Sequence, residues 1–163
     1  MKPFFVTSVS NLRNPHHLTL RACNFNFQPR AMEKYVILLE EDTDDWSLVK
    51  ETLNELDMNI PIRFFSNSDE MFRFIGEHPK PALIMADYNA LPDSGIEVLR
   101  KLKSDETLKE IPVVILSDSD LPHYKNQSYA LGASSFIKKP DTAEGTRKKI
   151  GTFFDYWFDV VEV

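Results

Sequence analysis

The sequence predicts a doubly wound α/β fold, in which five parallel strands form one sheet and five helices cover its two faces. Short apolar runs alternate with longer segments in which apolar residues recur every three or four positions. Polar turn residues or acids follow the apolar runs, so the runs end sharply. A length of 163 residues suits a single domain of this kind.

The predicted strands are short and rich in aliphatic, β-branched and aromatic residues. Runs of this type, bounded by turn residues, are typical of strands that are buried in a parallel sheet. The most informative run is residues 81–86, which is apolar throughout and leads directly into Asp87. We expect five strands, at Tyr35–Leu39, Ile60–Phe65, Ala82–Ala86, Ile111–Leu116 and Ser135–Ile137.

Five further segments have the spacing of amphipathic helices. In the first, Val49, Leu53 and the apolar residues around them lie three or four positions apart, and Asp42 or Thr43 can cap the helix. The fourth is more polar, but Pro122 suits its first turn and Gly132 suits the left-handed position after its end. We expect helices at Thr43–Leu56, Ser68–Glu77, Ser94–Lys103, Leu121–Leu131 and Asp141–Val160, the last ending in an aromatic cluster that we expect to be core.

The composition restricts the class of protein. A net charge of −6 argues against nucleic acid as the main partner. No apolar stretch approaches the roughly 18 residues that cross a bilayer, so we expect no membrane association. The single cysteine, Cys23, allows neither an internal disulfide nor a cysteine metal cluster, which fits a reducing, cytoplasmic compartment.

Residues 1–31 differ from the rest of the chain. They are rich in Asn, Pro, Ser and Phe, have no helical or strand period, and contain four basic residues and no acid. We expect a poorly ordered N-terminal extension, or an upstream start codon chosen in place of Met32. An organellar transit peptide has a similar acid-free composition and is the alternative. The folded domain is then expected at residues 32–163.

Charged and hydroxyl side chains stand at the carboxyl ends of four predicted strands. Glu40 and Glu41 follow the first strand, and Asp87 follows the third. Ser117 follows the fourth, and Lys139 follows the fifth, directly before a proline. Parallel strands end at one edge of the sheet, where such folds bind their ligands. Oxygen ligands suit Mg²⁺, and carboxylates, a metal ion and a lysine together suit a phosphoryl group.

The order of these motifs resembles the receiver domain of response regulators, of the CheY-like type. Residues 36–45 are similar to the first strand and acidic turn of that family, and Asp87 with Gly95 eight positions later resembles its phosphoacceptor loop. The strand that ends at Ser117 and the segment that ends in Lys139-Pro140 resemble the last two motifs. The likeness covers about residues 33–160 and implies a flavodoxin-like fold with a role in two-component phosphorelay signalling.

The resemblance implies a phosphoacceptor and a metal site. Asp87 would accept a phosphoryl group from a phosphohistidine. Mg²⁺ would be held by Glu40 and Glu41, by Asp87, and by the backbone carbonyl of Asn89.

The resemblance also implies a switch. Ser117 would donate a hydrogen bond to a phosphoryl oxygen, and Lys139 would form an ion pair with the phosphoryl group. Phe136 stands where the family has its switch aromatic, which follows the movement of the hydroxyl residue after phosphorylation.

Alternatives remain at two positions. The acidic pair of the family commonly ends in Asp, but here it ends in Glu41, whose side chain is roughly 1.5 Å longer. Glu41 therefore binds Mg²⁺ directly, binds it through water, or misses it; in the last case the chain is a pseudo-receiver that binds partners without being phosphorylated. A small phosphatase with an aspartate nucleophile is a third reading, but the second acid that such enzymes usually need is replaced by Asn89.

The expected partners follow from the resemblance. No DNA-binding module follows the last predicted helix. We therefore expect a stand-alone regulator that signals by protein contact and is not an enzyme acting on external substrates. The expected partners are a histidine kinase or histidine phosphotransfer protein and a downstream protein target, with the chain itself a monomer or weak homodimer.

Overall fold

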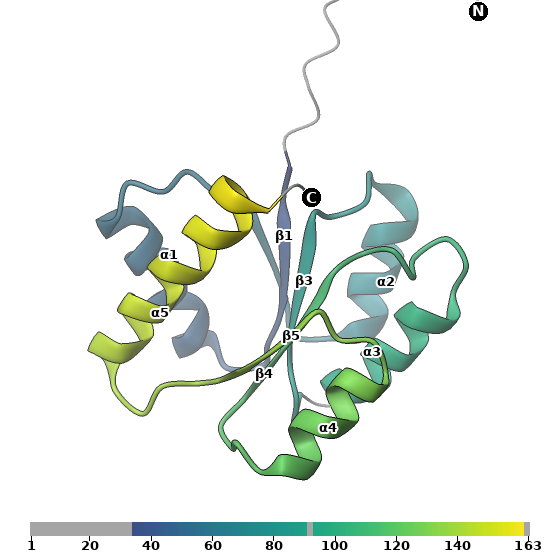
Figure 1. Cartoon of the computed structure of the whole chain (residues 1–163). Coiled ribbons are helices and arrows are strands. Elements are labelled where there is room, and N and C mark those ends of the chain that lie inside the picture. The colour runs from purple at the N-terminus through teal and green to yellow at the C-terminus, as the bar shows by residue number, and fades with distance from the viewer. Residues whose placement is uncertain (1–33, 91–92, 162–163) are drawn as a thin grey trace, which may run out of the picture.

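The computed structural model describes residues 34–90 and 93–161, which form one parallel sheet between two layers of helices (Figure 1). The strand order is β2-β1-β3-β4-β5, and every neighbouring pair is parallel. The doubly wound fold class is therefore confirmed, whereas the expected extension at residues 1–31 lies outside the described residues. The strands are β1 Val36–Leu39, β2 Ile62–Phe65, β3 Leu83–Asp87, β4 Val113–Ser117 and β5 Ser135–Lys138.

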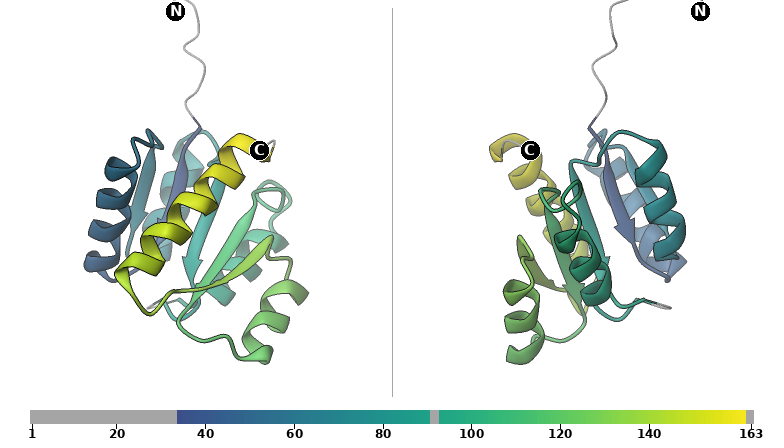
Figure 2. Two further views of the ribbon diagram at one scale, coloured as in Figure 1. Left: turned by 60° about the vertical axis from the view of Figure 1, so that its left-hand side comes forward. Right: turned by 90° about the vertical axis from the view of Figure 1, so that its right-hand side faces the viewer.

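The helices divide into two groups on opposite faces of the sheet. Two of them, α1 and α5, cover one face, and α2, α3 and α4 cover the other (Figures 1 and 2). Helix α5 does not continue to Val160 as one α-helix, because its last five residues are wound as a π-helix, η1. The bounds are α1 Thr43–Glu55, α2 Ser68–Glu77, α3 Gly95–Ser104, α4 Pro122–Ala130, α5 Ala143–Asp155 and η1 Tyr156–Val160.

Side-chain caps fix where four of the helices begin. Asp42 accepts a hydrogen bond from the backbone N–H of Asp44 at 2.8 Å and so starts α1 two residues after the acidic pair. Asn67 and Thr142 cap α2 and α5 in the same way. Because Thr142 is the cap, α5 begins later than the predicted Asp141. Ser94 forms a capping box at the start of α3.

Helix α4 has no side-chain cap, and the residues at its two ends define where it begins and where it stops. Pro122 lies in its first turn, and Gly132 has a φ of +92° after its end, as the sequence predicted. Ser128 is the buried residue of this helix. Helix α4 is therefore more loosely attached to the sheet than α3, which buries five residues.

Two hydrophobic cores lie on the two faces of the sheet. On the face under α2 and α3, the strand residues Ile37, Ile84 and Ile115 are completely buried. On the face under α1 and α5, the core is built around Phe154 and Trp157. The aromatic cluster predicted as core is thus mostly core, although Tyr156 is 54% exposed. Within the described part of the chain, no helix is long and apolar enough to cross a membrane.

Candidate functional site

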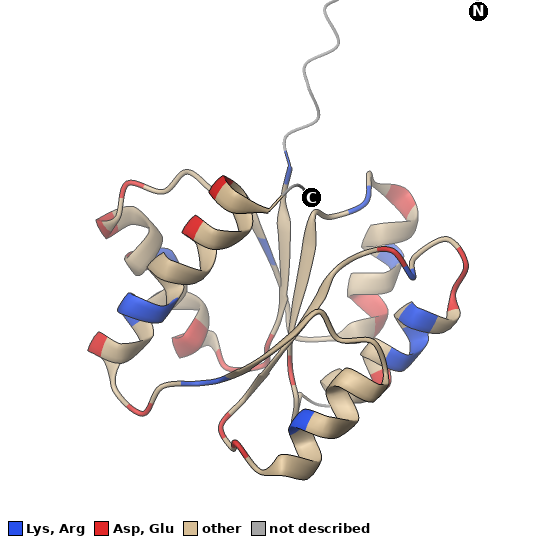
Figure 3. Ribbon diagram, in the orientation of Figure 1, with Lys and Arg blue, Asp and Glu red and all other residues tan. Residues whose placement is uncertain are grey.

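Strand alternation sends three charged side chains to the same side of the sheet. Leu83 and Met85 of β3 pack toward α1 and α5, and Asp87, two residues further on, continues that row. The same two-residue period places Glu40 after β1 and Lys139 after β5 on this side. Acidic residues gather in the loops at this carboxyl edge of the sheet (Figure 3).

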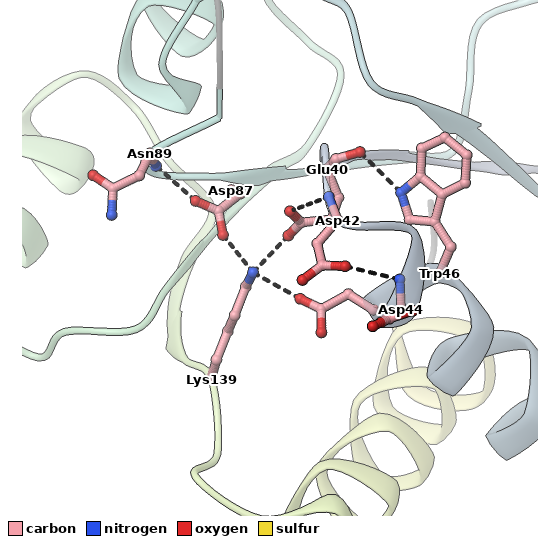
Figure 4. Close-up of polar contacts among 8 residues, drawn as sticks. Glu40, Asp42, Asp44, Trp46, Asp87, Asn89 and Lys139 are labelled. Atoms are coloured by element: carbon pink, nitrogen blue, oxygen red, sulfur yellow. Dashed lines mark hydrogen bonds and ion pairs between the residues drawn. The ribbon is translucent and has the colours of Figure 1, made fainter.

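Lys139 lies at the centre of the site. Its Nζ is 2.5 Å from Oε2 of Glu40, 2.5 Å from Oδ2 of Asp87 and 3.0 Å from Oδ2 of Asp45. Figure 4 shows the ammonium group between Asp87 and Glu40, with both carboxylates pointing toward it. The side chains of Glu40 and Asp87 are only 5% and 7% exposed, so these ion pairs are screened little by water.

The charges of this cluster are coupled. Burial by itself would lower the pKa of Lys139, but its hydrogen bonds to Asp87, Glu40 and Asp45 outweigh burial and raise the pKa above its ordinary value. Burial raises the pKa of Glu40, and Lys139 offsets only part of this rise. Lys139 therefore stays protonated at neutral pH, and three carboxyl groups surround this one ammonium group.

Further hydrogen bonds hold the two buried carboxylates in place. The second oxygen of Asp87 accepts a hydrogen bond from the backbone N–H of Asn89 at 2.6 Å. The second oxygen of Glu40 accepts one from the backbone N–H of Asp42 at 3.1 Å. The indole of Trp46 donates to the Glu40 carbonyl oxygen at 2.9 Å, so this ring is held against the acidic turn.

Gly95 allows the loop after Asp87 to return close to its own start. A Cβ atom at position 95 would lie 2.3 Å from the carbonyl oxygen of Asp87, which is far inside van der Waals contact. Only glycine therefore lets α3 begin directly against the end of β3. This contact is the physical reason for the glycine that the sequence motif contains.

Two of the predicted site residues face the other side of the sheet. The hydroxyl of Ser117 is fully buried and accepts a hydrogen bond from the backbone N–H of Ser119 at 3.2 Å. Phe136 is half-buried and packs against the core under α2 and α3. Ser117 touches the charged cluster through its backbone, because its carbonyl oxygen accepts a hydrogen bond from Lys139 N at 2.7 Å.

The predicted metal ligands are only partly brought together. Glu40 and Asp87 converge on Lys139, whereas Glu41 and Asn89 are exposed. Among residues 34–90 and 93–161, no group of three or more acid, histidine or cysteine side chains is arranged to hold a metal ion. The oxygen donors nevertheless suit a hard cation, which would share Glu40 and Asp87 with the lysine.

Asp45 is a member of the cluster that sequence reasoning missed. It stands in the first turn of α1, whose start at Thr43 turns this side chain back toward the end of β1. The acidic run from residue 40 to residue 45 was the only signal for it. By contrast, Asp93 lies at a structural contact: its Oδ2 accepts hydrogen bonds from Ser68 Oγ at 2.5 Å and Lys101 Nζ at 2.8 Å.

The charged cluster opens into a cavity of about 410 Å³, which Asp87 and Lys139 line together with apolar residues of α1, α5 and the sheet. The buried carboxylate of Asp87 is therefore accessible from this cavity. An oxygen nucleophile next to a fixed ammonium group, at an accessible sheet edge, is an arrangement that can accept an electrophilic group and neutralise its charge.

Comparison with known proteins gives a consistent result. A family model described as the response regulator receiver domain matches residues 36–150. The response regulator Rcp1 of Synechocystis sp. is 28% identical over 134 residues, which are 78% of this chain and 91% of that protein. The two-component response regulator ARR17 of Arabidopsis thaliana is 44% identical over 61 residues, but these are only 37% of this chain and 40% of that protein.

Comparison with solved structures gives the same result. The Mn²⁺-bound form of response regulator Rcp1 has a TM-score of 0.73 at 26% identity, covering 80% of this chain and 98% of that one. The phosphorylated cyanobacterial phytochrome response regulator RcpA also has a TM-score of 0.73 at 26% identity, covering 80% of this chain and 97% of that one.

Proposed function

The chain belongs to the response regulator receiver domain family, and on that premise we propose that Asp87 accepts a phosphoryl group from a phosphohistidine. A carboxylate oxygen of Asp87 forms a bond to phosphorus while the phosphorus–nitrogen bond breaks. The electron pair of that bond returns to the imidazole. The domain we assign to this function spans residues 32–163, and it acts as a signalling domain that assists only its own phosphorylation and dephosphorylation.

The ion pair between Lys139 and Asp87 is the observation that carries this proposal. At 2.5 Å, it places a protonated amine directly beside the proposed acceptor oxygen. The new phosphoryl group brings about two negative charges into a site where three carboxyl groups already surround one ammonium group. Lys139 is the group that compensates part of this charge, and the accessible cavity gives the phosphohistidine a route to Asp87.

The residues present fit a divalent cation of the Mg²⁺ type. We assign its ligands to the carboxylates of Glu40 and Asp87 and the backbone carbonyl of Asn89, with Glu41 acting through its long, exposed side chain. When bound, the ion supplies positive charge to the phosphoryl oxygens. A Mn²⁺-bound and a phosphorylated regulator among the structural relatives support both steps.

The switch residues belong to the same proposal. Ser117 turns its hydroxyl from Ser119 toward the phosphoryl group, and Phe136 follows into the space that is vacated. The partners are a histidine kinase or phosphotransfer protein and a downstream protein, met in the cytoplasm, and the chain is a monomer or weak homodimer.

The test is phosphorylation by acetyl phosphate, followed by intact-mass measurement with and without Mg²⁺. We expect one added phosphoryl group that requires Mg²⁺ and is lost in Asp87→Asn. The matched control is Asp93→Asn, which changes an acid that pairs with Lys101 outside the cluster and should still be phosphorylated.

A negative result identifies the alternative function. If neither acetyl phosphate nor beryllofluoride changes the Trp46 fluorescence or the mass at about 10 mM Mg²⁺, an excess over typical weak sites, the chain is a pseudo-receiver. Incorporation that persists in Asp87→Asn would instead show that another residue is the acceptor.

A further inference from the structure

The two faces of the sheet are not equally well covered. Under α2 and α3, the core residues of the interior strands β1, β3 and β4 are at most 1% exposed. Under α1 and α5, Leu83 is fully buried in the half of the sheet away from the charged edge, and so is Val114, which pairs with Met85. Nearer that edge, Met85 of β3 and Leu116 of β4 are only partly buried, although Leu38 of the neighbouring β1 is buried. Central strands of a doubly wound sheet are normally covered completely.

The cavity accounts for this difference. It lies between the carboxyl half of the sheet and the two helices, where Val49 of α1 and Ile150 of α5 line it opposite Met85 and Leu116. Its volume of about 410 Å³ falls in the range of small-molecule sites, which are mostly apolar pockets with a few polar groups at one end. The apolar atoms that face the cavity have no packed neighbours on that side, so an apolar group that entered would gain van der Waals contacts.

The charged residues at the mouth of the cavity determine which ligand charge the cavity favours. Two of the lining residues are lysines, and both are already engaged: Lys139 with three carboxylates and Lys149 with the Lys138 carbonyl oxygen. The negative potential that remains favours a cation and opposes an anion. The acids that line the cavity are Glu40, Glu41, Asp42, Asp45, Asp87 and Asp118.

We propose that this cavity is a binding site for a small amphipathic cation, a molecule with an apolar or aromatic body and a single amine group. The body lies between Met85, Val49 and Ile150, and the ammonium group lies at the acidic mouth. This site needs neither phosphorylation nor a metal ion, so it stands independently of the proposed phosphoacceptor function. Because the amine and a divalent cation would use the same carboxylates, their binding is mutually antagonistic.

Three probes of nearly equal shape test the charge selection. We would titrate the full chain, without Mg²⁺, with 1-naphthylmethylamine, 1-naphthalenemethanol and 1-naphthoate, using calorimetry and amide NMR. The cation should bind about tenfold more tightly than the neutral alcohol, and the anion most weakly, as expected for one favourable charge interaction near the surface. Added Mg²⁺ should weaken binding of the amine but not of the alcohol.

Cavity-filling variants test the location. Val49→Phe and Ile150→Phe introduce bulk from α1 and from α5, and each should weaken amine binding by about tenfold or more. Leu108→Phe is the matched control, because Leu108 is also half-buried but packs on the other face of the sheet. It should bind the amine like the wild type. Circular dichroism and thermal melting establish that each variant is folded.

The proposal is overturned by any of three results. These are no binding of the amine at about 1 mM, which is weaker than specific small-molecule sites, equal binding of the three probes, or unchanged binding in both folded filling variants. Since phosphorylation is not measured, failure here leaves the test of Asp87 untouched. Loss of phosphorylation in Asp87→Asn likewise says nothing about the apolar site.

Discussion

Single residues set the charge balance of the site, and Lys139 does so most directly. One ammonium group joins carboxylates that come from the end of β1, the start of α1 and the end of β3. A buried carboxylate that loses its only cationic partner is strongly destabilising, because its desolvation is no longer compensated. Lys139 therefore contributes to folding as well as to the proposed chemistry.

Lys139→Ala should lower the free energy of unfolding by about 2–3 kcal/mol without Mg²⁺, somewhat below the range for fully buried pairs. The expected loss lies below that range because one of the three partners, Asp45, has a side chain that is 41% exposed and well screened by water. Mg²⁺ should restore more stability to this variant than to the wild type, since the ion compensates the same carboxylates. Urea unfolding with and without Mg²⁺ measures both effects.

Lys138→Ala is the matched control for this prediction. Lys138 pairs with Asp141 at 3.2 Å on the surface, so its removal should change stability by less than about 0.5 kcal/mol. Equal losses in the two variants would contradict the account of Lys139.

Asp93 gives the chain a specific pH dependence. Hydrogen bonds from Lys101 and Ser68 lower the pKa of this carboxyl in the folded state. Because this carboxyl has a lower pKa in the folded state than in the unfolded state, its ionisation stabilises the fold at pH values above the unfolded pKa, which is near 4. The stabilisation is lost as the pH falls through the folded pKa. Asp93→Asn should therefore cost under about 1 kcal/mol at neutral pH, and this cost should shrink as the pH falls through the folded pKa of Asp93. A wild-type advantage that is unchanged at low pH would contradict this.

At the scale of elements, α3 is positioned by a contact that excludes any side chain at its first residue. Gly95→Ala should destabilise the domain by about 2 kcal/mol or more, because backbone must move to accept the new Cβ. Gly76→Ala, in the open interior of α2, is the control; nothing lies within 4 Å of its Cβ, and it should stabilise by about 0.5–1 kcal/mol. Thermal unfolding of both variants is the measurement, and a neutral Gly95→Ala would contradict the contact.

Helix α4 depends on the loop of the site for part of its attachment. The hydroxyl of Tyr88, the residue after Asp87, donates to Gln127 Oε1 at 2.8 Å, and its ring packs against Tyr124 at 4.2 Å. Tyr88→Phe removes one hydrogen bond worth about 1 kcal/mol, so amide exchange in α4 should rise about fivefold. Tyr156→Phe, at an exposed ring, is the control. Unchanged exchange in α4 after Tyr88→Phe would show that the hydrogen bond does not hold this helix.

For the whole molecule, the sequence sufficed for the fold and for the edge that carries the site. The alternation of apolar runs and helical spacing predicted every strand and every α-helix of the described residues, and parallel strands required Glu40, Asp87 and Lys139 to meet. The strand period also determines that Ser117 and Phe136 face the opposite side of the sheet from Asp87, although the sequence analysis did not predict their orientation.

Features that depend on packing between elements could not be read from the sequence. Asp45 joins Lys139 only because α1 starts immediately beside the end of β1. The π-helical turn after α5 and the cavity under α1 and α5 depend on how the helices fit the sheet. No local pattern of residues encodes that fit.

Location of the phosphoryl group is the most direct test of the central claim. The protein is phosphorylated with acetyl phosphate and Mg²⁺, the acyl phosphate is reduced with borohydride, and the peptides are sequenced by mass spectrometry. We predict homoserine at position 87, formed only from phosphorylated Asp87, and none in protein treated without Mg²⁺. Modification at Glu40 or Asp45, or none at all, would contradict the account.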